Sequence, residues 1–417
     1  MKQLLKRYLP KSLKMWLIRH RDRFYKSRLS KKMSIKHKNF LWNIKDKKKI
    51  KIVFLAIHRS TWKLDSVFKK MLQDPYFEPI ILVCPYVVYG EDSMHRDMAD
   101  TYQYFHDKGY PVLSSYNADD QSWLKLEEIS PDIIFFTNPH DLTRKEYYED
   151  AYLNYLSCYV PYHHEVDNED VQYNQIFHNA MWIIFSTHLV SRDLYLTLSC
   201  LKKQNIVLSG YPFLENISQL VIDKNSQEKK VIIYAPHHEI GRERPYSTFL
   251  EYADIMKKLS DKYKDQALFV FKPHPMLKSK LYIHQDWGKE RADSYFAYWE
   301  DSKHTQLNTG EYLELFQESD AMIHDCGSFL FEYLYFKKPV MYLLSKKNHK
   351  SQYNQLGIKA LDSIKNGRNV QDIESFIRCV ISGEIDNNSS IDFYMQCFHN
   401  DKSPSDKILN AIKEKIK

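Results

Sequence analysis

The chain has 417 residues, enough for two or three domains, and 43% of them are hydrophobic. With 27% charged residues and only 10 glycines, the composition excludes a wholly disordered chain and a glycine-rich fibrous one. The net charge of +7 is unevenly distributed. Residues 1–51 contain 19 Lys and Arg against two acids, whereas the rest of the chain has 41 Lys and Arg against 51 Asp and Glu.

Residues 1–48 form a basic arm. Leu5, Leu9, Leu13 and Leu17 recur every four residues beside Trp16, which places apolar side chains on one side of a helix among Lys and Arg. This pattern predicts an amphipathic helix that binds an anionic membrane surface. The alternative is a helix that packs on its own protein. Nucleic acid is not expected as a partner, because no recognisable nucleic-acid-binding fold follows the arm.

The cysteines and the apolar runs bear on the compartment. None of the six cysteines forms a CxxC pair, which favours free thiols in a reducing compartment. The apolar stretch at residues 15–18 is too short for a signal peptide, and no apolar run reaches the roughly 18 residues that span a bilayer. We therefore expect a cytoplasmic protein, peripheral on the inner face of the cell membrane.

From residue 50 onward, apolar runs alternate with amphipathic segments. The first series of runs covers residues 50–57, 80–84, 110–113, 132–137, 155–159 and 182–186. The second series covers residues 206–209, 231–235, 267–271, 321–324 and 339–344. Apolar runs separated by helices are typical of buried parallel sheets. The predicted fold class is α/β, with two tandem Rossmann-like, doubly wound domains at residues 49–200 and 201–375, and a helical tail at 376–417.

Ligands of doubly wound sheets bind beyond the carboxyl ends of strands, and polar residues follow several of these runs. Pro236, His237 and His238 follow one run, and Lys272 and His274 follow the next. His274 stands between two prolines that make a rigid turn. With Lys272 it suits binding and charge neutralisation at a phosphate. The alternative is a turn histidine with an ordinary hydrogen bond.

A third polar segment opens an apolar helix after residues 321–324. Asp325 and Gly327 lie in this tight turn, and Ser328 can cap the helix or bind a ligand. Free N–H groups at such a terminus attract phosphate. Glu332, one turn later on the same face, can accept hydrogen bonds from a ribose. The alternative is an ordinary N-cap with a solvated Glu332.

Two further histidines, His163 and His164, follow the run at 155–159. One of them can serve as a general base, and the alternative is a pair of surface loop histidines. His237 and His238 could also bind a metal with His274, but no HExxH or paired CxxC occurs, so no metal is predicted. The absence of GxGxxG and of a P-loop motif argues against a dinucleotide cofactor and a P-loop nucleotidase, and no other cofactor is predicted.

Four segments of the second half resemble, in order and spacing, the CDP-glycerol glycerophosphotransferase family, which comprises bacterial teichoic-acid and capsule polymerases and primases. The segments are SGYP at 209–212, IYAP at 233–236, FKPHP at 271–275 and SDAMIHDCGSFLFEYLYFKKPVMYL at 319–343. The resemblance covers roughly residues 205–345 and implies a glycosyltransferase-B-like fold. Residues 49–200 would then be the acceptor domain, and 201–375 the nucleotide-donor domain.

The resemblance also implies a reaction. Glycerol phosphate, or a related polyol or sugar phosphate, would move from a CDP-activated donor to a hydroxyl of a cell-surface polymer or lipid-linked acceptor, releasing CMP. By motif match, His274 takes the place of the family's essential histidine, Gly327 and Ser328 that of a serine pair, and Glu332 that of its acidic residue. Tyr211 and Pro236, from the first two segments, are expected at the substrate.

Two alternatives stay open. One is a glycosyltransferase of the same architecture that uses a nucleotide sugar in capsule or lipopolysaccharide synthesis. The absence of any Asp-x-Asp triplet weakens a metal-chelating site of that kind. The other is a catalytically inactive, membrane-docked partner, against which the histidines at the strand ends argue.

Overall fold

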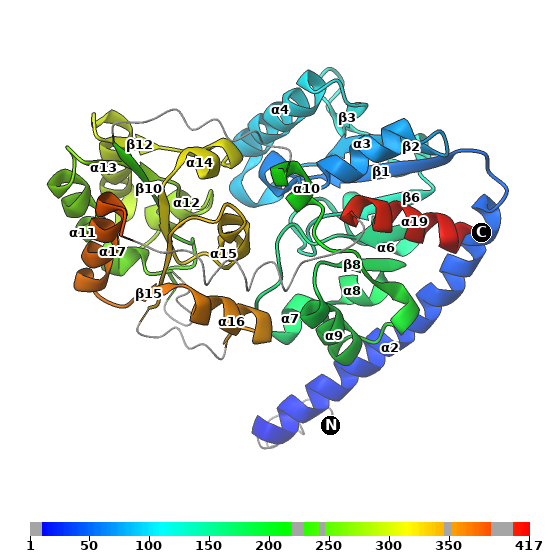
Figure 1. The fold of residues 1–417 in the computed structure, drawn as a ribbon. Helices are drawn as coiled ribbons and strands as arrows, with labels where there is room; N and C mark the ends of the chain where they lie inside the picture. The colour runs from blue at the N-terminus through cyan, green and yellow to red at the C-terminus, as the bar shows by residue number, and fades with distance from the viewer. Residues whose placement is uncertain (1–10, 219–228, 242–246, 346–351, 385–402) are drawn as a thin grey trace. The chain divides into compact units, whose positions relative to one another are not determined.

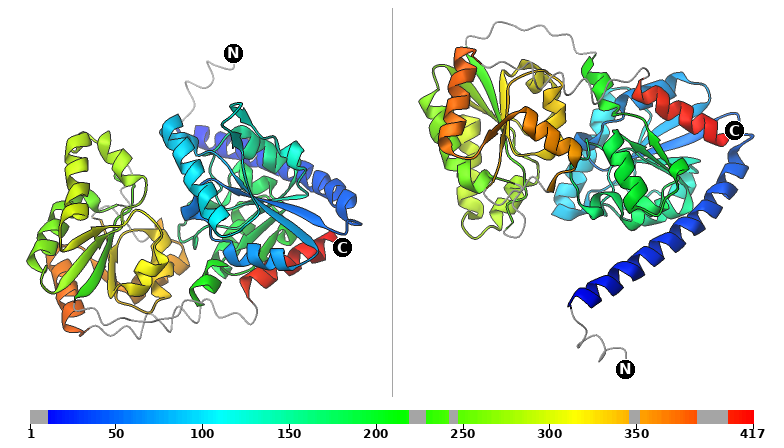
Figure 2. Two further views of the ribbon diagram at one scale, coloured as in Figure 1. Left: turned by 90° about the horizontal axis from the view of Figure 1, so that it is seen from above. Right: turned by 60° about the horizontal axis from the view of Figure 1, so that its bottom comes forward.

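The computed structural model describes residues 11–218, 229–241, 247–345, 352–384 and 403–417 (Figure 1). The chain divides into two compact units. The first comprises residues 1–165, 169–216 and 400–417, and the second comprises 166–168 and 217–399. Each unit is built on one parallel sheet that helices cover (Figure 2).

The sheet of the first unit has the strand order β3-β2-β1-β6-β7-β8-β9, and every pair of adjacent strands in it is parallel. Its strands are β1 (Ile50–Ala56), β2 (Phe77–Val83), β3 (Val112–Ser114), β6 (Ile133–Phe136), β7 (Leu156–Tyr159), β8 (Ile183–Ser186) and β9 (Ile206–Leu208). In β1, Ile52 and Phe54 join one apolar cluster, whereas Val53 and Leu55 join another. Both faces of this sheet are therefore buried, which is why its strands read as continuous apolar runs.

The helices of the first unit pack on these two faces. They are α2 (Lys11–Ile44), α3 (Asp65–Gln73), α4 (Glu91–Asp107), α5 (Leu126–Ile129), α6 (Glu149–Asn154), α7 (Asp170–Tyr173), α8 (Ile176–Ala180), α9 (Leu189–Leu198) and α19 (Pro404–Ile416). A small hairpin of β4 (Tyr116–Asn117) and β5 (Ser122–Trp123) accompanies them. Helix α10 (Phe213–Ser218) lies where the chain leaves this unit.

The sheet of the second unit has the order β12-β11-β10-β13-β14-β15 and is also fully parallel. Its strands are β10 (Lys230–Ala235), β11 (Ala267–Phe271), β12 (Thr305–Leu307), β13 (Ala321–His324), β14 (Val340–Leu343) and β15 (Lys365–Gly367). Its helices are α11 (Phe249–Lys262), α12 (Leu277–Tyr282), α13 (Gly288–Asp301), α14 (Leu313–Glu318), α15 (Gly327–Leu334), α16 (Gln355–Ser363) and α17 (Val370–Ser382). This strand order is the doubly wound one, so the α/β fold class of two tandem Rossmann-like units is confirmed.

Two parts of the predicted organisation differ from the structure. The run at 206–209 was assigned to the second series, but β9 pairs with β8 and completes the first sheet. The predicted helical tail at 376–417 does not form a domain of its own. Helix α17 packs in the core of the second unit through Ile373 and Ile377, whereas α19 packs beside α3 in the first (Figure 2).

Helix α2 shows how the basic arm is placed. From Lys26 onward, one side of this helix packs on the first unit through Met33, His37 and Ile44, and burial lowers the pKa of His37 to about 4. The alternative of a helix packed on its own protein therefore holds for this half. Leu5 and Leu9 lie outside the described residues. No helix within the described ranges is both long enough and apolar enough to cross a membrane.

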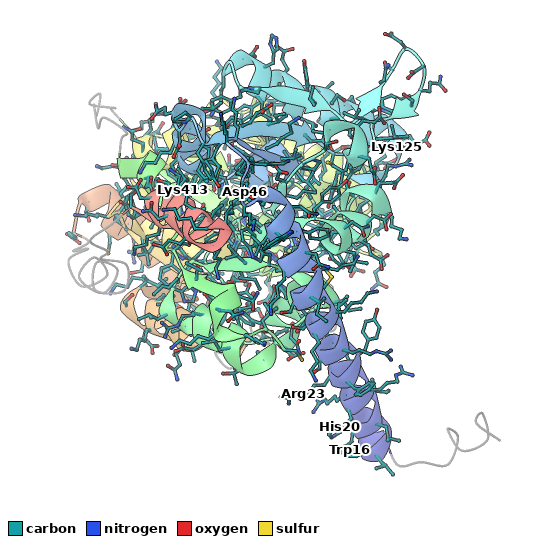
Figure 3. The ribbon with its side chains drawn as sticks, turned by 90° about the vertical axis from the view of Figure 1, so that its right-hand side faces the viewer. Trp16, His20, Arg23, Asp46, Lys125 and Lys413 are labelled. Carbon is teal, nitrogen blue, oxygen red and sulfur yellow. The ribbon has the colours of Figure 1, made fainter. Side chains whose placement is uncertain are left out.

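The opposite side of α2 carries exposed apolar side chains. At about 100° per residue, they fall within one arc of the helix, roughly opposite the packed side. They are Leu13, Trp16, Leu17, Phe24, Ile35 and Trp42. The exposed fractions of Phe24 and Trp42 are 69% and 70%. In Figure 3, Trp16, His20 and Arg23 lie on the part of α2 that projects beyond the rest of the first unit.

Candidate active site

Strands β10, β11 and β13 are neighbours, so the polar loops that follow them meet at one edge of the second sheet. His237 and His238 follow β10, and His274 follows β11. The ring of His274 lies 4.1 Å from that of His238 and 5.5 Å from that of His237, measured between centroids. The structure thus brings these three predicted site residues together.

Hydrogen bonds fix the tautomers of two of these rings. The Nδ1 atom of His274 accepts the backbone N–H of Met276 at 3.1 Å, and the Nδ1 of His237 accepts that of Glu239 at 3.1 Å. A neutral ring whose Nδ1 accepts a hydrogen bond carries its proton on Nε2. Both rings therefore present an Nε2–H donor, which suits an anionic ligand. The backbone N–H of His274 also bonds the carbonyl of Pro236 at 3.3 Å, which ties the loops after β10 and β11.

The remaining ring, His238, is held neutral. Burial, reinforced by the neighbouring His274, His237 and Lys280, lowers its pKa far below the usual value. Lys280, from helix α12, donates to the carboxylate of Glu239, the residue after His238, at 3.1 Å.

Asp325, of whose surface only 1% is exposed, is hydrogen-bonded to the loop that carries His237 and His238. Its Oδ1 accepts the backbone N–H of His237 at 2.5 Å, and its Oδ2 accepts both the backbone N–H and the hydroxyl of Thr248. Burial raises the pKa of Asp325 to about 6, against the opposing effect of these donors. Asp325 thus joins the loop after β10 to the start of α11 and positions His237.

Lys272 and Glu332 approach the same loop, that of residues 310–312. Lys272 is 5% exposed, and its Nζ donates to the carbonyl of Gly310 at 2.8 Å and lies 5.9 Å from the ring centre of Tyr312. The hydroxyl of Tyr312 donates to Glu332 Oε2 at 2.5 Å. Burial, and then the charge of Glu332, raise the pKa of Tyr312. Lys272 and Glu332 are therefore linked through one tyrosine, which the sequence did not single out.

Helix α15 begins at this edge of the sheet, with Cys326 as its N-cap residue. Gly327 and Ser328 are its first two residues, both half-buried, and the hydroxyl of Ser328 lies 3.0 Å from the Sγ of Cys326. The first N–H groups of a helix have no partner within the helix, and its dipole favours negative charge there. Predicted anion-binding residues thus stand on α15, the helix that follows β13.

The first unit places His163 and His164 differently, although they are adjacent. His163 is half-buried, and its Nδ1 lies 2.9 Å from the carbonyl of His164. Because a carbonyl only accepts, Nδ1 carries the proton and the neutral ring keeps its lone pair on Nε2. This is the tautomer of a general base, opposite to that of His274. Burial lowers the pKa of His163.

His164 is fully buried. Its ring packs 4.6 Å from that of Tyr211 and 6.0 Å from that of His188, and burial lowers its pKa well below the usual value. The hydroxyl of Tyr211 donates to the carbonyl of Tyr162 at 2.6 Å. Tyr211, expected at the substrate, therefore supports the histidine loop of the first unit.

Sequence reasoning missed Thr248 and Tyr312. Thr248 directly precedes an amphipathic helix, a position where Thr is favoured as a cap, and this signal could have marked it. Nothing in the sequence distinguishes Tyr312 among 31 tyrosines. Across the described ranges, no group of three or more His, Cys, Asp or Glu side chains is arranged to hold a metal ion.

Comparison with known proteins identifies the family. Residues 167–414 match the family described as CDP-Glycerol:Poly(glycerophosphate) glycerophosphotransferase. The minor teichoic acid biosynthesis protein GgaB of Bacillus subtilis (strain 168) is 25% identical over 230 residues, which are 51% of this chain and 24% of GgaB. The chain therefore spans about a quarter of that relative's length.

Solved structures extend the likeness to the whole fold. The wall teichoic acid polymerase TagF, soaked with CDPG, has a TM-score of 0.51 at 13% identity and covers 98% of both chains. The S. aureus MnaA–UDP structure has a TM-score of 0.57 at 16% identity, over 88% of this chain and 97% of that one. These likenesses show a glycosyltransferase-B-like fold. The chain belongs to the CDP-glycerol:poly(glycerophosphate) glycerophosphotransferase family.

Proposed function

We propose that the protein transfers glycerol phosphate, or a related polyol or sugar phosphate, from a CDP-activated donor to a hydroxyl of a cell-surface polymer or lipid-linked acceptor. The observation that carries the proposal is the pair of Nε2–H donors on His237 and His274, on the same edge of the sheet that carries α15. Membership of the family supports the class of reaction.

In the proposed step, the acceptor oxygen attacks the distal phosphorus of the donor. A new P–O bond forms, the bond from that phosphorus to the CMP oxygen breaks, and CMP leaves with the electron pair. His163 takes the hydroxyl proton on Nε2, since its Nδ1–H is committed to the carbonyl of His164.

The charge on the transferring phosphate needs donors already in place. His274 donates from Nε2, and the ammonium of Lys272, held by the carbonyl of Gly310, supplies positive charge. Ser328 and the first turn of α15 hold the CDP phosphates, and Glu332 accepts from the ribose. Asp325 contributes indirectly, by fixing the backbone of His237.

The test is CMP release from CDP-glycerol by the full chain and by the variant His274→Ala. We expect at least a roughly hundredfold loss of turnover with unchanged thermal unfolding. His284→Ala is the matched control, because His284 also accepts a backbone N–H on Nδ1 two residues along, from Asp286 at 3.3 Å, but lies outside the site. Normal turnover by His274→Ala would contradict the mechanism.

We also propose that the enzyme works on the cytoplasmic face of the membrane and docks there through α2. The exposed apolar side chains on the outer side of this helix support the proposal, because its packed side is already occupied by the protein. Arg28, Lys31 and Lys38 are exposed on the same outer side, and Lys45 lies 3.2 Å from the ring centre of Trp42. Aromatic and aliphatic side chains interleaved with Lys and Arg suit an anionic lipid surface.

A further inference from the structure

A three-residue strap, residues 166–168, belongs to the second unit although its neighbours on both sides in the chain belong to the first. The strap pairs in antiparallel fashion with residues 352–354. The N–H of Asn354 donates to the carbonyl of Val166 at 2.7 Å, and that of Asn168 donates to the carbonyl of Gln352 at 2.8 Å. The strap is therefore fixed by backbone hydrogen bonds at both of its ends.

The side chain of Val166, 1% exposed, fills a space left by two glycines. A Cβ atom built on Gly327, the first residue of α15, would lie 3.2 Å from Val166 Cγ2. A Cβ on Gly357, in the first turn of α16, would lie 2.9 Å from the carbonyl oxygen of Val166 and 3.0 Å from the Cβ of Tyr353. The first contact requires a shift of a side chain, whereas the second requires a shift of backbone.

The residues that hold the strap also reach the candidate site. The hydroxyl of Tyr353 lies 2.6 Å from that of Tyr342, and Tyr342 donates to the carbonyl of Asp325 at 2.7 Å. Asn354 caps α16 by accepting the N–H groups of Leu356 and Gly357. The strap thus belongs to the same packed layer as the turn that opens α15.

The N-terminal end of the strap, Val166, follows directly after the loop that carries His163 and His164. Val166 is the third residue after His163, and an extended chain spans at most about 3.6 Å per residue. The covalent chain therefore keeps the backbone of His163 within about 11 Å of Val166. The strap therefore fixes the point at which the histidine loop enters the second unit.

We infer that Val166 is a positioning residue for the transfer reaction: packed between Gly327 and Gly357, it anchors the loop that carries His163. The inference rests on the proposed function, because it concerns the loop that carries the proposed base. A Cβ on Gly327 would press on the side chain of Val166, and a Cβ on Gly357 would press on its carbonyl oxygen.

The experiment compares four variants of the full chain: Gly357→Ala, Gly327→Ala, Val166→Ala and the double variant Gly327→Ala with Val166→Ala. Gln355→Ala, exposed at the first position of α16, is the matched control. For each we would measure hydrogen exchange of amides 163–168, the turnover number with CDP-glycerol, and the affinity for CDP-glycerol by calorimetry.

We expect Gly357→Ala to lower the turnover number by about tenfold or more, with donor affinity within about twofold of wild type, because a displaced base affects the step and not the binding. Amides 163–168 should exchange at least about tenfold faster. Gly327→Ala and Val166→Ala should each show a smaller loss of turnover. The double variant should regain activity, because the new Cβ of residue 327 takes the space that the methyl groups of Val166 leave. Val166→Ala should not restore Gly357→Ala, whose nearest atom is a carbonyl oxygen.

Two results would overturn the inference: a double variant no better than Gly327→Ala alone, or a loss of donor affinity in Gly357→Ala that matches its loss of turnover. If the wild-type chain does not turn over CDP-glycerol, the proposed function fails, and the exchange measurement still decides the role of Val166. Unchanged hydrogen exchange of amides 163–168 in Gly357→Ala would then show that the packing of Val166 against Gly357 does not hold the strap in place.

Discussion

The carboxylate of Asp325 accepts the backbone N–H of His237, with a donor–acceptor distance of 2.5 Å. The acid is buried, and its second oxygen is bonded to Thr248, so one side chain fixes both the loop after β10 and the start of α11. Asp325 thus holds the backbone of His237, and the N–H of Glu239 sets the tautomer of its ring.

The raised pKa of Asp325 predicts a stability change between pH 4 and pH 6. Because its pKa is about 6 in the folded protein and 3.8 ordinarily, the folded chain keeps a proton in this window that the unfolded chain has lost. The stabilisation is complete below pH 4 and lost as the pH rises through about 6. A shift of this size corresponds to roughly 3 kcal/mol in the free energy of unfolding.

The measurement is chemical denaturation of the wild type and of Asp325→Asn from pH 4 to pH 7. Asn does not titrate, and its NH2 group leaves a buried donor such as the N–H of Thr248 unpaired, at a cost of about 1–3 kcal/mol. We expect the advantage of the wild type to be largest at pH 4 and to shrink by roughly 3 kcal/mol at pH 7. An advantage independent of pH would show that Asp325 does not titrate as described.

The two adjacent histidines of the first unit should respond differently to substitution. His163→Gln removes the proposed base from a half-buried ring, so we expect at least a roughly hundredfold loss of turnover with little change in stability. His164→Ala leaves a cavity beside Tyr211 and His188, and we expect it to lower the free energy of unfolding by about 2–4 kcal/mol. Equal effects on stability, or full activity of His163→Gln, would contradict these roles.

The lowered pKa of His163 sets the acid side of the pH profile. Burial favours the neutral ring, so the base form persists below the ordinary value of 6.5. Turnover at saturating donor should therefore stay constant down to pH 6.5 and fall only below it. A fall that begins above pH 7 would point to another base.

Membrane docking through α2 is tested by two neighbouring residues on different sides of the helix. Leu17 and Ile18 are similarly exposed, at 44% and 52%, but only Leu17 lies on the outer apolar arc. Leu17→Glu should weaken binding of the full chain to anionic phosphatidylglycerol vesicles by about tenfold. Ile18→Glu makes the same charge change off that arc, and we expect a clearly smaller effect in the same sedimentation assay. Equal losses of vesicle binding in the two variants would indicate that the added negative charge, and not the apolar arc, causes the effect, and would contradict docking through this arc.

Much of the fold could be predicted from the sequence, because strands buried on both faces read as continuous apolar runs. The sequence analysis did not predict the edge strands β12 and β15. Each has only three residues, and the sequence KNG of β15 contains no apolar residue with a strand preference. The prediction that β9 belongs to the second sheet was wrong for a different reason. Sheet membership depends on pairing between distant segments, which the local pattern does not contain.

Part of the candidate site could also be predicted from the sequence. The rule that ligands bind beyond strand ends placed His237, His238 and His274 in one group, and the structure brings them together. It could not separate His163 from His164, because their burial depends on Tyr211 and His188 from other segments. Val166 is apolar and follows no motif, so only its packing against Gly327 and Gly357 marks it.

The most direct test of the account is calorimetric titration of the full chain with CDP-glycerol, CDP, UDP and UDP-sugars, repeated with Ser328→Ala. We predict selective binding of the cytidine nucleotides, weakened in the variant, since Ser328 stands on the first turn of α15. Preference for a uridine nucleotide would contradict the account and favour a glycosyltransferase. Binding of none of them would favour an inactive partner.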